Sequence, residues 1–315
     1  MRVAVVINAS AGSLLGREKA AEEVAEHLEA AGLDAAIEHD DGRGLVQRIS
    51  AAARSGAQAV VVGGGDGTIA CAAAHLAGTD TALGILPLGT MNLLAKDLRL
   101  PLNLTEAADA LAHGTIRAID VGDVNGHTFL INSVLGMPSR LAVTREKKRG
   151  VMALGDYYRF AVSGMRSLTR YPPLHVALDL GGDGRRRLRT RALAVVDNDY
   201  DEGFGQIFSR SRLDGGELVV YALRGLNVWR IVRFAFGMAL GNWRSTPGLE
   251  RHVARHLVIH SRRKQLRVMN DGEVVLIRPP LRYRIRPRAL KVIVPEAAAD
   301  KAQPEAPAVP IDAAL

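Results

Sequence analysis

The sequence predicts an α/β domain with a mainly parallel sheet, followed by a second, β-rich domain. Two observations predict this order. Over residues 1–115, short apolar runs alternate with stretches of helical periodicity, which is the rhythm of a layered α/β domain. Over residues 116–280, short strand-like runs follow one another with turn residues between them, which is typical of a β-sandwich.

The first domain is predicted to contain four strand–helix pairs. The strands are expected at residues 3–7, 34–38, 59–62 and 82–86, and the helices that follow them at 17–31, 44–55, 68–76 and 91–98. A further helix is expected at 104–113. Ligands of parallel sheets collect beyond the carboxyl ends of the strands, so the loops that leave these strands are the first candidates for a site.

The second domain is predicted from shorter apolar runs. Strands are expected at 116–124, 126–135, 174–180, 192–196, 218–223, 256–260, 266–269 and 274–277, with one helix at 139–169. Residues 281–294 return to strand-like alternation, and we expect them to rejoin the first domain. The tail, 295–315, is rich in alanine and proline and is expected to be disordered.

Composition narrows the class of protein. The formal charge of +8 favours an anionic partner, but with 4% aromatic residues the chain has no basic–aromatic platform, so we expect no nucleic-acid partner. The single cysteine, Cys71, and a start that lacks the features of a signal peptide favour a location in the cytoplasm.

The apolar stretch 228–240 contains two arginines and is too short to span a membrane. Its aromatic residues indicate core packing, or else a helix near a lipid cleft. The oligomeric state stays open.

Three strand-to-helix loops have unusual chemistry: NASAG at 8–12, GGGDGT at 63–68 and PLGTMN at 87–92. Glycines permit a close approach of phosphate, and the amides at a helix start receive anionic oxygens. The alternative for the second loop is a tight turn with Thr68 as N-cap, and for the third an ordinary capping turn.

Asp66 complicates a phosphate cradle, because a carboxylate repels phosphate unless a cation or a proton-transfer role offsets the charge. It could instead cap its own turn. No lysine follows the last glycine, so this loop is not a Walker A motif. Far along the chain, Asp271 and Glu273 flank Gly272, which is the pattern either of a solvated hairpin tip or of a general base for phosphoryl transfer.

The set of motifs resembles the diacylglycerol kinase catalytic-domain family, which includes bacterial lipid kinases and sphingosine kinases: NASAG near the start, GGGDGT, PLGTMN about twenty residues later, and DGE near the end. The resemblance extends to about residue 294. GGDGT alone is shared with NAD kinases and phosphofructokinases. The resemblance implies an NAD kinase/phosphofructokinase-like fold with a β-sandwich. It also implies ATP-dependent transfer of a phosphoryl group to the hydroxyl of a diacylglycerol-like membrane lipid, with Mg²⁺, as in phospholipid biosynthesis.

The resemblance also assigns residues. Asp271 would accept the proton of the lipid hydroxyl. Metal would lie near Asp66, Asp120 and Asp214. ATP would contact Asn8, Ala9, Ser10, Ala11, Gly12, Gly64, Gly65, Asp66, Gly67, Thr68, Ile69, Ala70, Thr90, Asn92 and Glu273.

Three positions depart from the family pattern. Leu93 stands where many members have aspartate, and Gly215 stands where members with a structural Mg²⁺ commonly have aspartate, so Asp214 would have to compensate. The threonine that many members have at the adenine side is replaced by residues 39–41, His-Asp-Asp.

A lipid acceptor requires access to a bilayer, and three basic runs are candidates for peripheral contact with an anionic membrane surface, at its inner face. They lie at 145–149, 185–191 and 262–264. Each run is equally well interpreted as a solvated face. Two alternatives to a lipid kinase stay open: an NAD kinase-like enzyme, and a non-catalytic nucleotide- or lipid-binding protein of the same fold.

Overall fold

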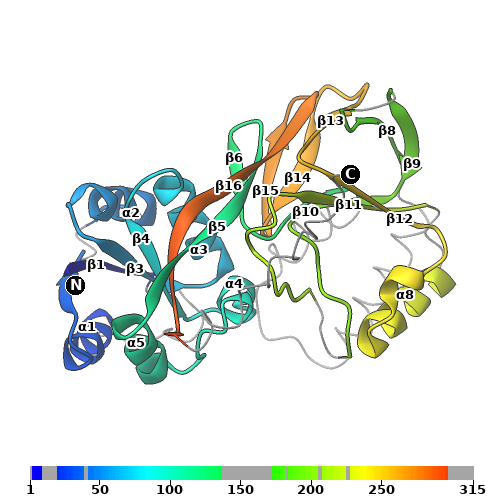
Figure 1. The fold of residues 1–315 in the computed structure, drawn as a ribbon. Coiled ribbons are helices and arrows are strands. Elements are labelled where there is room, and N and C mark those ends of the chain that lie inside the picture. The colour runs from blue at the N-terminus through cyan, green and yellow to red at the C-terminus, as the bar shows by residue number, and fades with distance from the viewer. Residues whose placement is uncertain are drawn as a thin grey trace, which may run out of the picture.

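The computed structural model describes residues 2–8, 20–38, 42–136, 172–181, 184–204, 208–224 and 228–296. Figure 1 shows two lobes, one of helices around a sheet and one dominated by strands, with α8 (Val228–Leu240) at the far side of the second lobe. The expected helix at 139–169, the basic run at 145–149 and the tail beyond residue 296 lie outside the described residues.

Four parallel strands form the centre of the first lobe. Their order is β2 (Asp34–Ile37), β1 (Arg2–Ile7), β3 (Ala59–Gly64) and β4 (Ala82–Pro87). Every residue of β3 and β4 is buried, as expected for parallel strands that are covered on both faces.

The helices of this lobe cover the two faces of the sheet separately. Apolar side chains of α2 (Leu45–Arg54) and α3 (Asp66–Leu76) pack with one face, including Val60 and Val62. Side chains of α1 (Ala20–Ala30) and α5 (Leu104–Ala112) pack with the other face, including Val61. Alternate residues of β3 therefore point into two cores, and the lobe has three layers.

β16 (Leu281–Val294) continues this sheet from one lobe into the other. Near its end, Val292 pairs in parallel with Leu83 of β4. Near its start, Arg282 pairs antiparallel with Val258 of β13 (His256–His260). Along its length β16 also pairs with β5 (Thr115–Val124), with a register shift between Arg286 and Leu290. The long orange-red arrow in Figure 1 shows this crossing.

Two sheets pack against each other in the second lobe. One is the continuation of the first sheet through β13, β8 (Leu174–Asp179) and β9 (Arg186–Thr190), together with β6 (His127–Phe129), which pairs with β5. The other is antiparallel throughout the described residues, in the order β12 (Leu249–Ala254), β11 (Leu218–Leu223), β10 (Ala192–Asp197), β7 (Asn132–Gly136), β14 (Leu266–Asn270) and β15 (Glu273–Ile277). Side chains of both sheets form one apolar core. The predicted fold class is confirmed.

The structure corrects several predicted elements. The strand expected at 126–135 is broken into β6 and β7, because the backbone amides at 130–132 turn to a carboxylate rather than to a neighbouring strand. The arginine-rich β9 and the strand β12 were not predicted, because neither contains an apolar run: β9 has two buried residues among exposed arginines, and β12 has only half-buried and exposed residues. The short helix after PLGTMN, α4, covers only Leu93–Asp97.

α8 has an inward and an outward side. Phe234 and Met238 pack against the core, and the Phe234 ring meets Trp243 of the short 3-10 helix Trp243–Ser245 at a centroid distance of 6.0 Å. Phe236, by contrast, is 65% exposed. Within the described residues, no helix is long and apolar enough to cross a membrane.

Candidate functional site

The GGGDGT loop is tied to the first strand of the lobe. Gly65 is the N-cap of α3, so the helix begins at Asp66, and the alternative in which Thr68 is the N-cap does not hold. Thr68 is instead buried, and its Oγ1 accepts a hydrogen bond of 2.9 Å from Asn8 Nδ2. A β-carbon on Gly64 would lie 2.6 Å from Thr68, so only glycine fits there. Ile69 is buried and Ala70 half-buried in the helix that follows.

The PLGTMN loop packs directly on GGGDGT. Its Asn92 is buried with a left-handed backbone (φ 49°), and its side chain accepts from the Gly89 amide and donates to the carbonyls of Pro87 and Gly89. A β-carbon on Gly89 would lie 2.5 Å from the Cα of Gly65. The backbones of the two loops are therefore in close contact. Thr90, in the second loop, is exposed to solvent.

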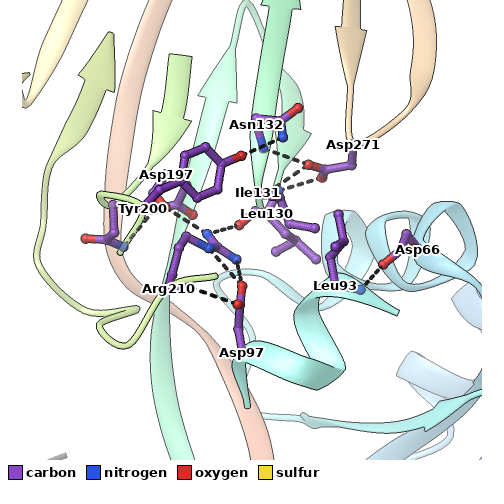
Figure 2. Close-up of polar contacts among 11 residues, drawn as sticks. Asp66, Leu93, Asp97, Leu130, Ile131, Asn132, Asp197, Tyr200, Arg210 and Asp271 are labelled. Atoms are coloured by element: carbon purple, nitrogen blue, oxygen red, sulfur yellow. Dashed lines mark hydrogen bonds and ion pairs between the residues drawn. The ribbon is translucent and has the colours of Figure 1, made fainter. Parts of the chain in front are cut away.

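Asp66 joins these two loops. Its Oδ2 accepts from the Asn92 amide at 3.0 Å and its Oδ1 from the Leu93 amide at 2.7 Å, at the start of α4. Figure 2 shows the contact to Leu93. The carboxylate thus caps a helix that lies 26 residues later in the chain. The sequence suggested a cap of its own turn or a place near metal, and did not indicate a cap of α4, because the partner loop is distant along the chain.

Asp271 lies at the tip of the β14–β15 hairpin, with φ 47°. Its Oδ2 accepts from the Leu130 amide at 2.6 Å, and its Oδ1 from the amides of Ile131 and Asn132 at 2.9 and 3.0 Å. Burial raises the pKa of Asp271, while these three amides and the charge of Arg210 act against the rise. The three hydrogen bonds hold the carboxylate in place. Among the described residues, its Oδ2 accepts one hydrogen bond and its Oδ1 accepts two.

The DGE tip and the GGGDGT loop meet between the lobes. A β-carbon on Gly67 would lie 3.0 Å from Oε1 of Glu273, whose side chain is exposed. Residues that are about two hundred positions apart in the chain therefore face one another. The absence of a side chain at Gly67 leaves the space that the glutamate occupies.

A buried ion pair beside this junction was not predicted from the sequence. Arg210 donates from Nε and Nη2 to Oδ2 of Asp97, at 2.9 and 2.7 Å, and from its backbone amide to Oδ1 at 3.0 Å. The two side chains are 1% and 3% exposed. Burial by itself lowers the pKa of Arg210, but the charges of Asp97 and Asp197 raise it overall. Nothing local marks either residue, because their partners are more than a hundred positions away.

Two of the carboxylates expected near metal, Asp120 and Asp214, make contacts with other groups of the protein. Asp120 is buried and accepts from the amides of Gly216 and Arg288 and from Asn198 Nδ2. Asp214 instead lies 3.5 Å from Arg117. No group of three or more histidine, cysteine or acidic side chains within the described residues has the arrangement of a metal site. In this arrangement Asp120 binds backbone amides and Asp214 pairs with an arginine.

Some predicted residues lie outside the described residues: Ala9 to Gly12 of the NASAG loop, and residues 39–41. Asn8 is described, and its amide donates to Gly63 at 2.9 Å. Asp197, which sequence analysis did not single out, is buried next to the site, and burial raises its pKa well above the usual range.

Comparison with known proteins matches both halves of the chain. Residues 2–124 match the diacylglycerol kinase catalytic domain, and residues 141–294 match the YegS C-terminal NAD kinase beta sandwich-like domain. A probable lipid kinase YegS-like protein of Pseudomonas aeruginosa is 31% identical over 293 residues, covering 90% of this chain and 92% of the relative. A second such protein, from Pseudomonas savastanoi, is 38% identical over 276 residues, covering 82% of each chain.

A diacylglycerol kinase of Bacillus subtilis is 27% identical over 179 residues, covering 56% of this chain and 58% of the relative. Among solved structures, a putative diacylglycerol kinase from Bacillus anthracis superposes with a TM-score of 0.71 at 20% identity, over 94% of this chain and 98% of the other. An NAD kinase from Archaeoglobus fulgidus superposes with a TM-score of 0.50 at 12% identity, over 96% and 97% of the two chains. These structural likenesses describe the fold.

Proposed function

Because the chain belongs to the family of diacylglycerol kinases and YegS-like lipid kinases, we propose that it transfers the γ-phosphoryl group of ATP to a hydroxyl group of a diacylglycerol-like lipid. The observation that carries the proposal is the meeting of the two motifs: Glu273, two residues from Asp271, lies against Gly67 of the glycine loop. A base for the acceptor and a cradle for phosphates thereby share one junction.

ATP is proposed to occupy the first-lobe side of this junction. The amides that begin α3, from Gly65 to Thr68, and the exposed hydroxyl of Thr90 offer donors for phosphate oxygens. The remaining proposed ATP contacts are Asn8 to Gly12, Gly64, Asp66, Ile69, Ala70, Asn92 and Glu273. Asp66 and Asn92 would act through the shape of the loops, since their side chains already bind backbone groups.

The proposed reaction is a single displacement. The lipid hydroxyl oxygen forms a bond to the γ-phosphorus as the bond from that phosphorus to the β,γ-bridging oxygen breaks, and ADP leaves. Oδ2 of Asp271 accepts the hydroxyl proton. Mg²⁺ is proposed to arrive with ATP as its magnesium complex and to screen the phosphates, with Asp66, Asp120 and Asp214 as the candidate neighbours from the sequence.

The lipid acceptor implies contact with a membrane surface, which we propose is peripheral, at the cytoplasmic face. The exposed run Arg262, Arg263 and Lys264 and the exposed arginines of β9 supply positive charge for it. Arg185, just before β9, lies 4.0 Å from Asp179, and Arg186 lies 3.9 Å from Glu250. These acidic neighbours reduce the positive charge that this part of the chain offers to a membrane.

The test is phosphoryl transfer from labelled ATP in the presence of Mg²⁺, with total membrane lipid in one reaction and NAD in another. Mass spectrometry identifies the labelled product. We compare the wild type with Asp271→Asn, which cannot accept the proton, and with the control Asp109→Asn, whose side chain is exposed. We expect a phosphorylated lipid from the wild type and the control, and at least a hundredfold slower transfer in Asp271→Asn, as general-base catalysis contributes about 10²–10⁴-fold.

Two results would contradict the proposal. Labelled NAD without labelled lipid would make the protein an NAD kinase. Equal background transfer by the wild type and Asp271→Asn to every lipid, with ATP still bound, would leave a binding protein of this fold.

A further inference from the structure

The buried pair Asp97–Arg210 joins the lobes next to Asp271. Asp97 ends α4 of the first lobe, and Arg210 lies between β10 and β11 of the second. Three donors of Arg210 converge on one carboxylate, so the pair is held in one geometry (Figure 2).

The remaining guanidinium nitrogen of Arg210 faces the backbone that holds Asp271. Nη1 donates to the carbonyls of Leu130 and Asp197, both at 2.7 Å. The Leu130 carbonyl belongs to the same peptide group as the Ile131 amide, and that amide donates to Oδ1 of Asp271. A charged donor at the carbonyl end both fixes this peptide and polarises its N–H toward the carboxylate.

α4 links the same pair to the glycine loop. The helix begins at amides that donate to Asp66 and ends at Asp97. Asp66, α4, Asp97, Arg210 and the peptide 130–131 thus form one continuous series of contacts from the GGGDGT loop to Asp271. A change at the ion pair would therefore alter where Asp271 stands relative to the loop that precedes α3.

Stability alone does not account for this pair. Replacing a buried ion pair by neutral side chains of similar volume is often harmless to stability, whereas the arrangement around Arg210 gives it two backbone carbonyls beyond its carboxylate partner. Two other titratable side chains, Asp197 and Tyr200, also act on Asp271 electrostatically from the second lobe. Neither residue is substituted in the variants below, and the charge of Arg210 lowers the pKa of each against the effect of burial.

We propose that Asp97 and Arg210 are positioning residues for the phosphoryl transfer: through the peptide group between Leu130 and Ile131 they set the position of the Asp271 carboxylate relative to the glycine loop. The inference rests on the proposed function for its kinetic test. Its spectroscopic test does not depend on the identity of the acceptor.

The first experiment compares the neutral pair Asp97→Asn/Arg210→Met with the control Arg251→Met. The asparagine introduced at position 97 would keep an oxygen for the amide of residue 210. Arg251, on β12, makes the same Nε and Nη2 contacts with one carboxylate oxygen of Asp199. We expect kcat to fall about a hundredfold in the double variant, as for a displaced catalytic group, with KM for ATP within about twofold, and kcat of the control to stay near that of the wild type. A double variant that keeps wild-type kcat overturns the proposal.

Arg210→Lys keeps the positive charge but cannot reproduce the planar fork that spans Asp97 and two carbonyls. Arg210→Lys takes the place of the double variant in the kinetic test if the double variant does not fold. We expect a lower kcat at unchanged KM for ATP, and full wild-type activity in Arg210→Lys would contradict a positioning role.

The second experiment is a pH titration of the Asp271 carboxyl carbon by NMR in protein with ¹³C-labelled aspartate, assigned by its loss in Asp271→Asn. Because Arg210 favours the charged form of Asp271, we expect its pKa to rise in the double variant and to stay at the wild-type value in Arg251→Met. An unchanged pKa in the double variant overturns the inference even if the acceptor proves not to be a lipid. A wild type that phosphorylates no lipid but shows this shift would contradict the proposed function alone.

Discussion

At the scale of single residues, the acidic side chains of the site differ in the partners that their carboxylate oxygens bind. Asp66 and Asp120 are occupied by backbone amides, and Asp214 by an arginine, whereas Asp271 keeps an oxygen with one described donor. A carboxylate that accepts hydrogen bonds from backbone amides stabilises the local fold. The sequence could not show this difference, because residue type alone does not reveal what a carboxylate oxygen contacts.

We predict that Asp66→Asn weakens the connection between the two loops. Asparagine replaces one of the two acceptor oxygens by a donor, which would face an amide at the start of α4. An unpaired buried donor costs about 1–3 kcal/mol, so the free energy of unfolding should fall by that amount and KM for ATP should rise. Denaturant unfolding and steady-state kinetics measure both. If Asp66→Asn matches the exposed control Asp109→Asn in stability, the capping role is refuted.

The buried Asp197 predicts a pH dependence of stability. Its pKa is raised in the folded protein, so its contribution to stability is fully present below the unfolded value of about 3.9 and is lost as the pH rises through the folded value. The asparagine of an Asp197→Asn variant does not titrate. The variant should therefore gain stability relative to the wild type as the pH rises from about 4 toward neutrality. Parallel curves of unfolding free energy against pH for the two proteins would contradict this expectation.

At the scale of elements, the site depends on loops that approach one another closely and on an interrupted strand. The turn at Gly65 and Gly89 brings two backbones together, and the break between β6 and β7 frees three amides for Asp271. The periodicity of residues 126–135 predicted one continuous strand, because apolar alternation reports which side chains are buried and not where the amides of the backbone donate.

We predict that Gly89→Ala disrupts the junction of the two nucleotide loops. Its β-carbon would lie 2.5 Å from the Cα of Gly65, and backbone on both sides leaves little room to adjust. Overpacking of this kind costs about 1–3 kcal/mol, and KM for ATP should rise. The matched control is Gly44→Ala at the start of α2, where an added β-carbon meets nothing within 4 Å and the backbone has φ −63°. Equal behaviour of the two variants, in thermal unfolding and ATP kinetics, would show that the close approach is unimportant.

At the scale of the whole molecule, one strand, β16, belongs to both lobes, and the ion pair Asp97–Arg210 fastens them a second time. The net charge of +8 is a property of the whole chain. How much this charge contributes to membrane binding depends on which arginines and lysines are exposed and have no acidic neighbours.

We predict that the turn at 262–264 strengthens association with anionic vesicles. Neutralising Arg262, Arg263 and Lys264 to glutamine should weaken vesicle binding by on the order of 1 kcal/mol per residue at low salt, with the difference shrinking as salt is added. Transfer to a dispersed short-chain lipid should not change. Sedimentation with vesicles measures binding, and Arg54→Gln, on the exposed side of α2, is the control for the loss of one positive charge elsewhere. A triple variant that binds as well as the wild type would rule out this turn as a contact.

The sequence by itself determined the alternation of strands and helices in the first lobe, the β-rich second lobe and the motifs GGGDGT, PLGTMN and DGE, because each of these depends on neighbours within a few residues. Only the tertiary structure decided that Asp66 caps α4, that three amides of a broken strand hold Asp271, and that Arg210 pairs with Asp97. Those contacts join residues from 26 to 141 positions apart. Burial and hydrogen bonding at such separations depend on how the whole chain packs, and no local pattern of residues records them.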